Sequence, residues 1–344
     1  MKTYLVKIPQ DNSKTASAFR EVFVQLHETL GNDRVAFELV CLGQNTGFCF
    51  TAPDATAEVV AGQIYALAAD ADIEEISDFY RAVQVGTKVV SAEIALSRHD
   101  LYPINDYRSF EGDSLSGLLS VLSKSRPGEG AVLQIVARSV RDTGGHQLVL
   151  SLRRKIDRLR HKIRFKYWFK REVSQEIFNR LLEKTHERLF KVNLRVLCFS
   201  SDPAVDPEIR LKAICGALAN YNTLDLNRLK VVRTRRDFYA LKEFKDRTLR
   251  GGFFLSTTEL ATLYHLPSED EVPNLIHVLS KKEAPPTHLP TNLNDPEISL
   301  FGMTNFRGQH IPFGLKRADR RRHLYVLGKS GVGKSRLLQL LIRS

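Results

Sequence analysis

The chain has 344 residues, of which 43% are hydrophobic and 26% charged, an ordinary balance for a soluble globular protein with room for two or three domains. No run approaches the roughly eighteen apolar residues of a membrane helix, so the sequence predicts no transmembrane segment. The net charge of +12 and the pI near 9.5 are unusual. They favour an anionic partner such as nucleic acid or a lipid surface, with a solvated basic linker as the alternative.

The four cysteines are widely spaced and form no C-x-x-C pair or Cys/His cluster, which argues against zinc. They are Cys41, Cys49, Cys198 and Cys215. We therefore expect buried free thiols in a reducing cytoplasm. Cys41 and Cys49 flank a predicted hairpin turn, so a pair close in space is the alternative.

The first hundred residues predict alternating strands and helices. An alternating strand at 2–8 precedes a helix at 13–31 whose apolar stripe includes Phe19 and Leu26. The later elements are a hairpin of strands at 34–42 and 47–52, a helix at 53–69 and a strand at 83–95. This β-α-β-β-α-β order is that of a ferredoxin-like split β-α-β unit.

The most basic stretch follows a short helix at 115–123 and a strand at 131–140. Ten of the residues from 151 to 172 are Lys or Arg, and apolar residues recur at helical spacing. We expect an amphipathic helix that binds polyanions through Arg153, Arg154, Arg158 and Lys162. Its aromatic residues near Trp168 suit base stacking or a membrane interface, and packing against the next domain is the alternative.

A second α+β unit is predicted next, from a helix at 173–189 to a short helix opened by a capping box at Ser256 and Glu259. A proline-rich run then marks a linker. The predicted domains are an N-terminal α+β domain (1–145), a basic amphipathic helical linker (146–172), a second α+β domain (173–280), a proline-rich linker (281–297) and the truncated start of a P-loop ATPase domain (298–344).

The strongest motif is G-K-S-G-V-G-K-S, from Gly328 to Ser335, which matches G-x-x-x-x-G-K-[ST]. A short apolar run at 323–327 predicts a strand before it, and 336–344 predicts a helix after it. Backbone N–H groups of such a loop bind phosphates, Lys334 reaches the β- and γ-phosphates, and the Ser335 hydroxyl ligates Mg²⁺. The predicted ATP-binding residues are Gly328, Lys329, Ser330, Gly331, Val332, Gly333, Lys334, Ser335 and Arg336. A glycine-rich turn without function is the alternative.

A motor also needs an acidic strand end to hold Mg²⁺ and orient water, and usually an arginine finger. No such motif follows Ser335 in this sequence. We therefore expect the front part of a longer ATPase, unable to hydrolyse ATP by itself. The predicted fold class is α+β: two ferredoxin-like or related accessory domains, followed by the truncated start of an α/β RecA-like P-loop domain.

Four segments carry a family resemblance: F-E-L-V at 37–40, L-S-T-T-E-L-A-T-L-Y-H-L-P at 255–267, F-G-M-T-N-F-R-G at 301–308 and the block at 319–335. They resemble TraG/TraD-like and HerA/FtsK-like P-loop ATPases, the type IV secretion coupling and conjugative DNA-transfer proteins. Gly328, Gly331, Gly333, Lys334 and Ser335 match the family's nucleotide loop. This loop reads S-G-V-G-K-S-R where relatives more often have T-G-T-G-K-S-T.

The resemblance implies a DNA-translocating ATPase that forms a hexameric ring, is cytoplasmic and associates peripherally with a secretion-like complex at the inner face of the membrane. DNA, the ring and that complex are the implied partners of the full-length protein. Two alternatives stay open. One is a scaffold module of a secretion complex without motor activity, and the other is a secretion-assembly ATPase that moves protein rather than DNA.

Overall fold

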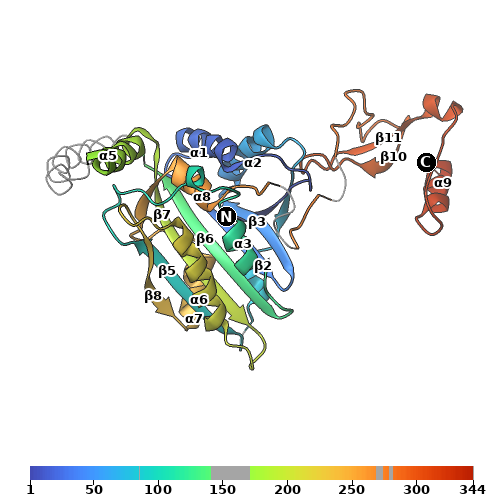
Figure 1. The fold of residues 1–344 in the computed structure, drawn as a ribbon. Coiled ribbons are helices and arrows are strands. Elements are labelled where there is room, and N and C mark those ends of the chain that lie inside the picture. Colours follow the sequence, from blue (N-terminus) through green and yellow to red (C-terminus); the bar gives the residue numbers. More distant parts are fainter. Residues whose placement is uncertain (85, 141–170, 269–273, 279–281, 344) are drawn as a thin grey trace. The chain divides into compact units, whose positions relative to one another are not determined.

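The computed structural model describes residues 1–84, 86–140, 171–268, 274–278 and 282–343 (Figure 1). The chain forms two compact units, Met1–Val278 (unit 1) and Leu279–Ser344 (unit 2). Unit 1 combines a large, mostly antiparallel sheet with several helices, which confirms the α+β class. The basic stretch predicted at 146–172 lies outside the described residues up to 170, so its helix stays a prediction.

The first six elements form a split β-α-β motif. The order of its strands in the sheet is β4-β1-β3-β2, and each neighbouring pair is antiparallel. The elements are β1 (Lys2–Lys7), α1 (Ala16–Thr29), β2 (Arg34–Leu42), β3 (Asn45–Ala52), α2 (Asp54–Leu67) and β4 (Asp72–Ile76). The motif was predicted, but its fourth strand was wrong: β4 replaces the strand at 83–95. Sequence patterning missed β4 because D-I-E-E-I is short and acidic.

The next elements repeat the same topology. Their strands lie in the order β6-β7-β5-β8, again antiparallel throughout. The elements are β5 (Lys88–Leu96), α3 (Ser116–Leu122), β6 (Glu129–Ser139), α5 (Arg171–His186), β7 (Leu189–Ser200), α6 (Pro207–Ala217) and β8 (Leu229–Arg235). The strand expected to complete the first motif is therefore the first strand of the second.

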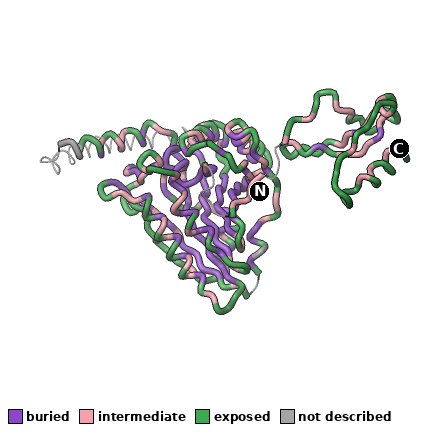
Figure 2. The backbone as a smooth tube through the Cα atoms, turned by 45° about the vertical axis from the view of Figure 1, so that its right-hand side comes forward, coloured by how far each residue is buried: buried purple, intermediate pink, exposed green. Residues whose placement is uncertain are grey.

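The two motifs join edge to edge through β2 and β6, which pair antiparallel from Arg34↔Arg138 to Leu42↔Gly130. With β9 (Phe253–Ser256) beside β7, they form one sheet of nine strands. The two domains predicted at 1–145 and 173–280 thus lie in one unit. In each motif alone, β2 or β6 would be an edge strand with unpaired backbone groups, and the pairing of β2 with β6 satisfies these groups. The strands β2, β6 and β7 are buried along almost their whole length (Figure 2).

Each face of the sheet has its own apolar layer. The first face packs against α1, α2, α3, α6 and α8 (Thr257–Leu263). The second face packs against a 3₁₀ turn, η1 (Phe79–Ala82), and α7 (Phe238–Lys245). Cys41 and Cys49 belong to opposite faces, because Cys49 lies opposite Glu38, three residues from Cys41, and side chains alternate along a strand. All four cysteines are free thiols, and only Cys215 is partly exposed.

Shorter elements complete the description. Unit 1 also has the 3₁₀ turns η2 (Tyr107–Ser109) and η3 (Leu218–Tyr221). Unit 2 contains the antiparallel pair β10 (Ile298–Met303) and β11 (Pro312–Lys316), then η4 (Arg317–Arg321) and α9 (Lys334–Arg343). Within the described part of unit 2 this pair is the whole sheet, so the RecA-like domain stays a proposal. Among the described residues, no helix has the length and apolar character needed to cross a bilayer.

Candidate nucleotide-binding loop and buried ionic clusters

The backbone of the glycine-rich loop in unit 2 adopts positive φ angles and a close approach that favour glycine. Gly331 and Gly333 have φ values of +85° and +92°, in a region that L side chains rarely adopt. A Cβ on Gly328 would meet the side chain of Val332 at 2.6 Å, because the loop folds back over this position. Helix α9 begins directly after Gly333, at Lys334. The predicted order of loop and helix is therefore present.

The side chain of Lys334 closes the loop. Its ammonium group donates hydrogen bonds to the carbonyl oxygens of Gly328 at 2.5 Å and of Lys329 at 2.7 Å. Ser335 and Arg336 are exposed on the first turn of α9. The unpaired N–H groups of a helix start and its positive dipole end favour an anion here. The loop thus places a cation, a hydroxyl and a helix N-terminus together.

The strand predicted before the loop is absent: residues 323–327 are irregular, and Leu324, Tyr325 and Leu327 are exposed. A strand needs a neighbour for its hydrogen bonds, and the described strands of unit 2 pair only with each other. Leu338 and Ile342 on α9 are also exposed, beside a groove of about 490 Å³ that Leu315 and Leu324 help to line. This unit therefore presents an uncovered apolar surface around its loop.

The predicted metal ligand fits magnesium only together with a nucleotide. Ser335 offers one exposed hydroxyl, and among the described residues no group of three His, Cys, Asp or Glu side chains gathers to hold a metal. Mg²⁺ commonly takes one or two protein ligands and fills its other positions with phosphate oxygens and water. The predicted polyanion-binding residues Arg153, Arg154, Arg158 and Lys162 lie outside the described residues.

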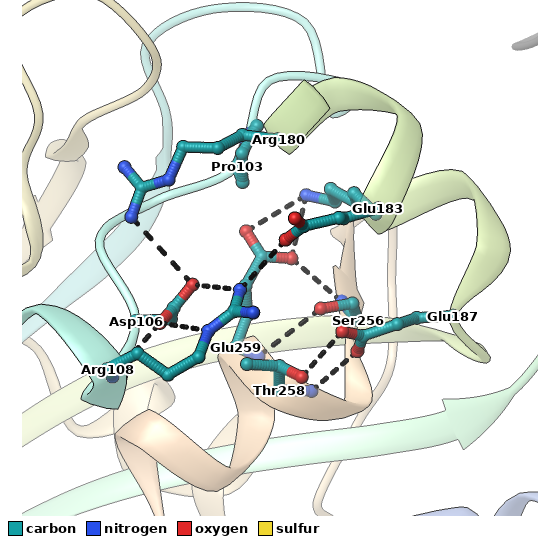
Figure 3. Close-up of a pocket in the computed structure, with 10 residues that line it drawn as sticks. Pro103, Asp106, Arg108, Arg180, Glu183, Glu187, Ser256, Thr258 and Glu259 are labelled. Atoms are coloured by element: carbon teal, nitrogen blue, oxygen red, sulfur yellow. Dashed lines mark hydrogen bonds and ion pairs between the residues drawn. The ribbon is translucent and has the colours of Figure 1, made fainter. Parts of the chain in front are cut away.

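Unit 1 contains a small polar pocket between α5, α8 and the segment before η2 (Figure 3). At its base, Lys184 and Glu259 form an ion pair of 2.8 Å and are 4% and 2% exposed. Glu259 also completes the predicted capping box, accepting a hydrogen bond from the Ser256 backbone N–H at 2.8 Å, which confirms that prediction. The free volume is about 10 Å³, enough for about one water molecule. These charges therefore brace α5 against α8 and leave no room for a substrate.

The segment with the most specific resemblance, residues 255–267, is buried throughout. His265 lies between two acceptors: its Nδ1 is 2.7 Å from the Ala261 carbonyl oxygen, and its Nε2 is 2.9 Å from Asp113 Oδ1. Both ring nitrogens therefore lie within hydrogen-bonding distance of an oxygen acceptor. Asp113 also accepts the Leu115 N–H at 2.8 Å. The segment thus ties α8 to the loop before α3, a structural role.

This pair predicts a pH dependence of stability. Burial raises the pKa of Asp113, but His265 and the backbone N–H groups of Leu115 and Ser268 together more than offset burial, so the pKa lies below its ordinary value. A depressed carboxyl pKa contributes stability that is present above the unfolded value of about 3.9 and is lost as the pH falls through the folded value. We expect Asp113→Asn to lose less stability than the parent between neutral pH and pH 3, measured by urea unfolding, with exposed Asp11→Asn as the control. Equal losses in all three proteins would contradict this.

A second ionic cluster lies on the opposite face of the sheet, under α7 and η1. Glu38 on β2 is fully buried and accepts hydrogen bonds from Gln134 at 2.7 Å, Thr51 at 2.9 Å and Tyr80 at 3.1 Å. Arg247 lies 3.4 Å from the same carboxylate. Burial raises the pKa of Glu38 above its ordinary value, against the opposing effect of Arg247. Four separate segments therefore meet on one buried carboxylate.

Arg247 connects this cluster to the surface. Its guanidinium donates to both carboxylate oxygens of Asp78, at 2.6 Å and 3.1 Å, and lies 5.0 Å from the centre of the Tyr80 ring. Burial lowers its pKa, but Glu38, Asp78 and Tyr80 together more than offset burial, so the pKa is raised. Its φ of +45° is unusual for a residue other than glycine. Both terminal nitrogens of the guanidinium are hydrogen-bonded within the protein, while Nε has no hydrogen-bond partner and lies 3.4 Å from the Glu38 carboxylate. Contacts of this kind mark a brace rather than an open site.

Comparison with known proteins assigns a family to unit 1 through a match that does not extend into unit 2. A family model described as a domain of unknown function, DUF8128, matches residues 9–275. The chain belongs to this family. The DUF8128 match runs through almost all of unit 1 and ends before the glycine-rich loop, so it covers the sheet from β2 onward and both ionic clusters. None of the curated proteins matches the chain. Membership in the DUF8128 family thus accounts for the sheet domain, whereas the loop has to be interpreted from its own geometry.

Proposed function

We propose that the loop from Gly328 to Arg336 binds ATP with Mg²⁺, and that this chain belongs to a DNA-translocating, type IV secretion-like ATPase. The observation that carries the proposal is the loop itself: two glycines with positive φ, a lysine folded onto the loop and a helix starting at that lysine. A loop of this form binds a polyphosphate with backbone N–H groups.

Binding exchanges one set of contacts for another. The Lys334 ammonium group leaves the carbonyl oxygens of Gly328 and Lys329 for the β- and γ-phosphates, to which its charge is better suited. Ser335 supplies its hydroxyl to Mg²⁺, and the N-terminus of α9 faces the anion. Hydrolysis also needs a water-orienting carboxylate and a second cation. We assign no residue to the water-orienting carboxylate or to the second cation, so the proposed activity of this chain is nucleotide binding and not hydrolysis.

Movement of DNA, assembly as a ring and attachment to a secretion complex at the membrane come from the resemblance of the segments at 37–40, 255–267, 301–308 and 319–335. The second candidate is a scaffold module without motor activity. One observation favours it: the DUF8128 match covers residues 9–275, which is most of unit 1 and does not include the loop. An ATPase that moves protein is the third possibility, and DNA-stimulated turnover distinguishes it from the first.

Nucleotide titration of the whole chain tests the proposal. With a fluorescent ATP analogue and Mg²⁺, we expect saturable binding that Lys334→Ala weakens at least tenfold, about 1.4 kcal/mol, because a charge-assisted contact to phosphate is lost. Lys316→Ala is the matched control, since it removes an exposed cation from the same unit. No binding by the parent at millimolar nucleotide, or equal affinity in parent and Lys334→Ala, would overturn the assignment.

A further inference from the structure

The two outer strands of the large sheet carry opposite charge. β4 is at one edge and reads D-I-E-E-I, with Glu74 and Glu75 exposed. β8 is at the other edge and reads L-K-V-V-R-T-R, with Lys230 and Arg233 exposed. Within the part of the chain that the structure describes, neither strand pairs with a second strand on its outer side. One domain thus presents an acidic edge and a basic edge.

The basic edge has the features of a strand that accepts a neighbour. All but two of its seven residues are exposed, and Val231 and Val232 are 45% and 50% exposed. An exposed edge strand is a template for strand addition, and charges on an edge commonly oppose self-pairing. In this sheet, the charges of β8 disfavour pairing with another β8 strand but not pairing with β4. Two β8 strands would place cations opposite cations, whereas β8 beside β4 places cations opposite carboxylates.

The charges also share one face of the sheet. Register places Arg233 opposite Glu93 and Lys230 opposite Ala95, on the face that α7 covers. On β4, Glu74 lies opposite Leu5, whose side chain is on the same face. Because side chains alternate along a strand, a sheet that continues from β8 into β4 of another copy brings these cations and carboxylates to one face.

Strand direction permits this continuation. Each neighbouring pair on the path β4-β1-β3-β2-β6-β7-β5-β8 is antiparallel. With eight strands on the path, β4 and β8 run in opposite directions. A second copy placed beyond β8 without being turned over therefore presents its β4 antiparallel to β8, and the alternation continues across the junction.

We propose that copies of this protein associate head to tail, with β4 of one copy added to β8 of the next. Such a contact is heterologous, so it builds a closed ring or an open filament according to the rotation between copies. Existing ion pairs exchange partners: Glu74 pairs with Lys7, and Arg233 lies 4.0 Å from Glu93. The contact is a single pair of short strands, so association is weak and favoured by low salt. It does not depend on nucleotide binding.

Two charge-reversal variants of the whole chain, studied separately and mixed, test the proposed contact between β4 and β8. Variant A is Lys230→Glu with Arg233→Glu, and variant B is Glu74→Lys with Glu75→Lys. Each alone places like charges at the junction, so we expect sedimentation velocity at low salt to show association weakened at least tenfold, about 1.4 kcal/mol. Mixing A with B restores association, because each edge then faces the opposite charge again.

The matched control for variant A is Lys14→Glu with Lys124→Glu, which makes the same change in charge as variant A at exposed sites away from both edge strands. We expect it to associate like the parent. Circular dichroism verifies that each variant is folded. A parent that is monomeric at every concentration, association that A and B leave unchanged, or an A and B mixture that stays monomeric would overturn the proposal. Unchanged association would point instead to the apolar surface of unit 2.

Discussion

Replacing Arg247 by Met is expected to lower the free energy of unfolding of unit 1 by about 3–5 kcal/mol, the usual cost of removing one partner of a buried ion pair. Arg247 is 3% exposed and Glu38 is fully buried. Without the guanidinium, Glu38 either keeps an uncompensated charge in the core or takes up a proton, and Asp78 loses two hydrogen bonds. Since a domain is typically stable by only about 5–15 kcal/mol, this single change removes a large part of the total.

Urea unfolding followed by far-ultraviolet circular dichroism measures this loss. The control is Arg236→Met, because Arg236 pairs with Glu208 while its side chain is 72% exposed, and exposed pairs contribute about 1 kcal/mol or less. Adding Glu38→Gln to Arg247→Met is expected to recover part of the stability, because it removes the stranded carboxylate. A loss of no more than about 1 kcal/mol in Arg247→Met would show that the cluster contributes little.

Reversing Arg153, Arg154, Arg158 and Lys162 to Glu is expected to abolish retention of the whole chain on DNA. Ten of residues 151–172 are Lys or Arg, and only Asp157 and Glu172 oppose them, so this segment holds most of the net charge of +12. Binding to a phosphate backbone weakens with salt, with a log–log slope of about −0.9 for each phosphate neutralised on duplex DNA. Losing four cations and adding four anions removes that attraction.

Retention on a DNA column or on anionic vesicles, read across a salt gradient, measures the effect. The control reverses four exposed cations elsewhere in unit 1, namely Lys14, Lys124, Arg126 and Lys212. It has the same total charge as the test variant, so a difference between the two locates the binding segment. Unchanged circular dichroism confirms folding. Binding of the test variant equal to that of the parent would mean that the basic face is only a solvated surface.

The sequence alone determined many of the local elements. Apolar periodicity placed α1 and the hairpin of β2 and β3 within a few residues of their observed bounds. The capping box at Ser256 and Glu259 was predicted correctly from a short pattern. Gly331 and Gly333, predicted to form the loop, have positive φ values, and their binding of nucleotide stays a prediction. Such features depend on residues within a few positions of each other, where propensity and hydrogen bonding act directly.

The tertiary structure alone decided how the two motifs join and what their polar residues do. The pairing of β2 with β6 connects positions about a hundred residues apart, and Glu38 meets Arg247 across 209 residues. No local pattern records such contacts, because an apolar strand fits any partner of matching face. Local patterning assigned no element to the acidic strand β4, whose backbone finds its hydrogen-bond partners only beside β1. The absence of a strand at 323–327 has the same cause, since a β-prone run becomes a strand only where a neighbour completes its hydrogen bonds.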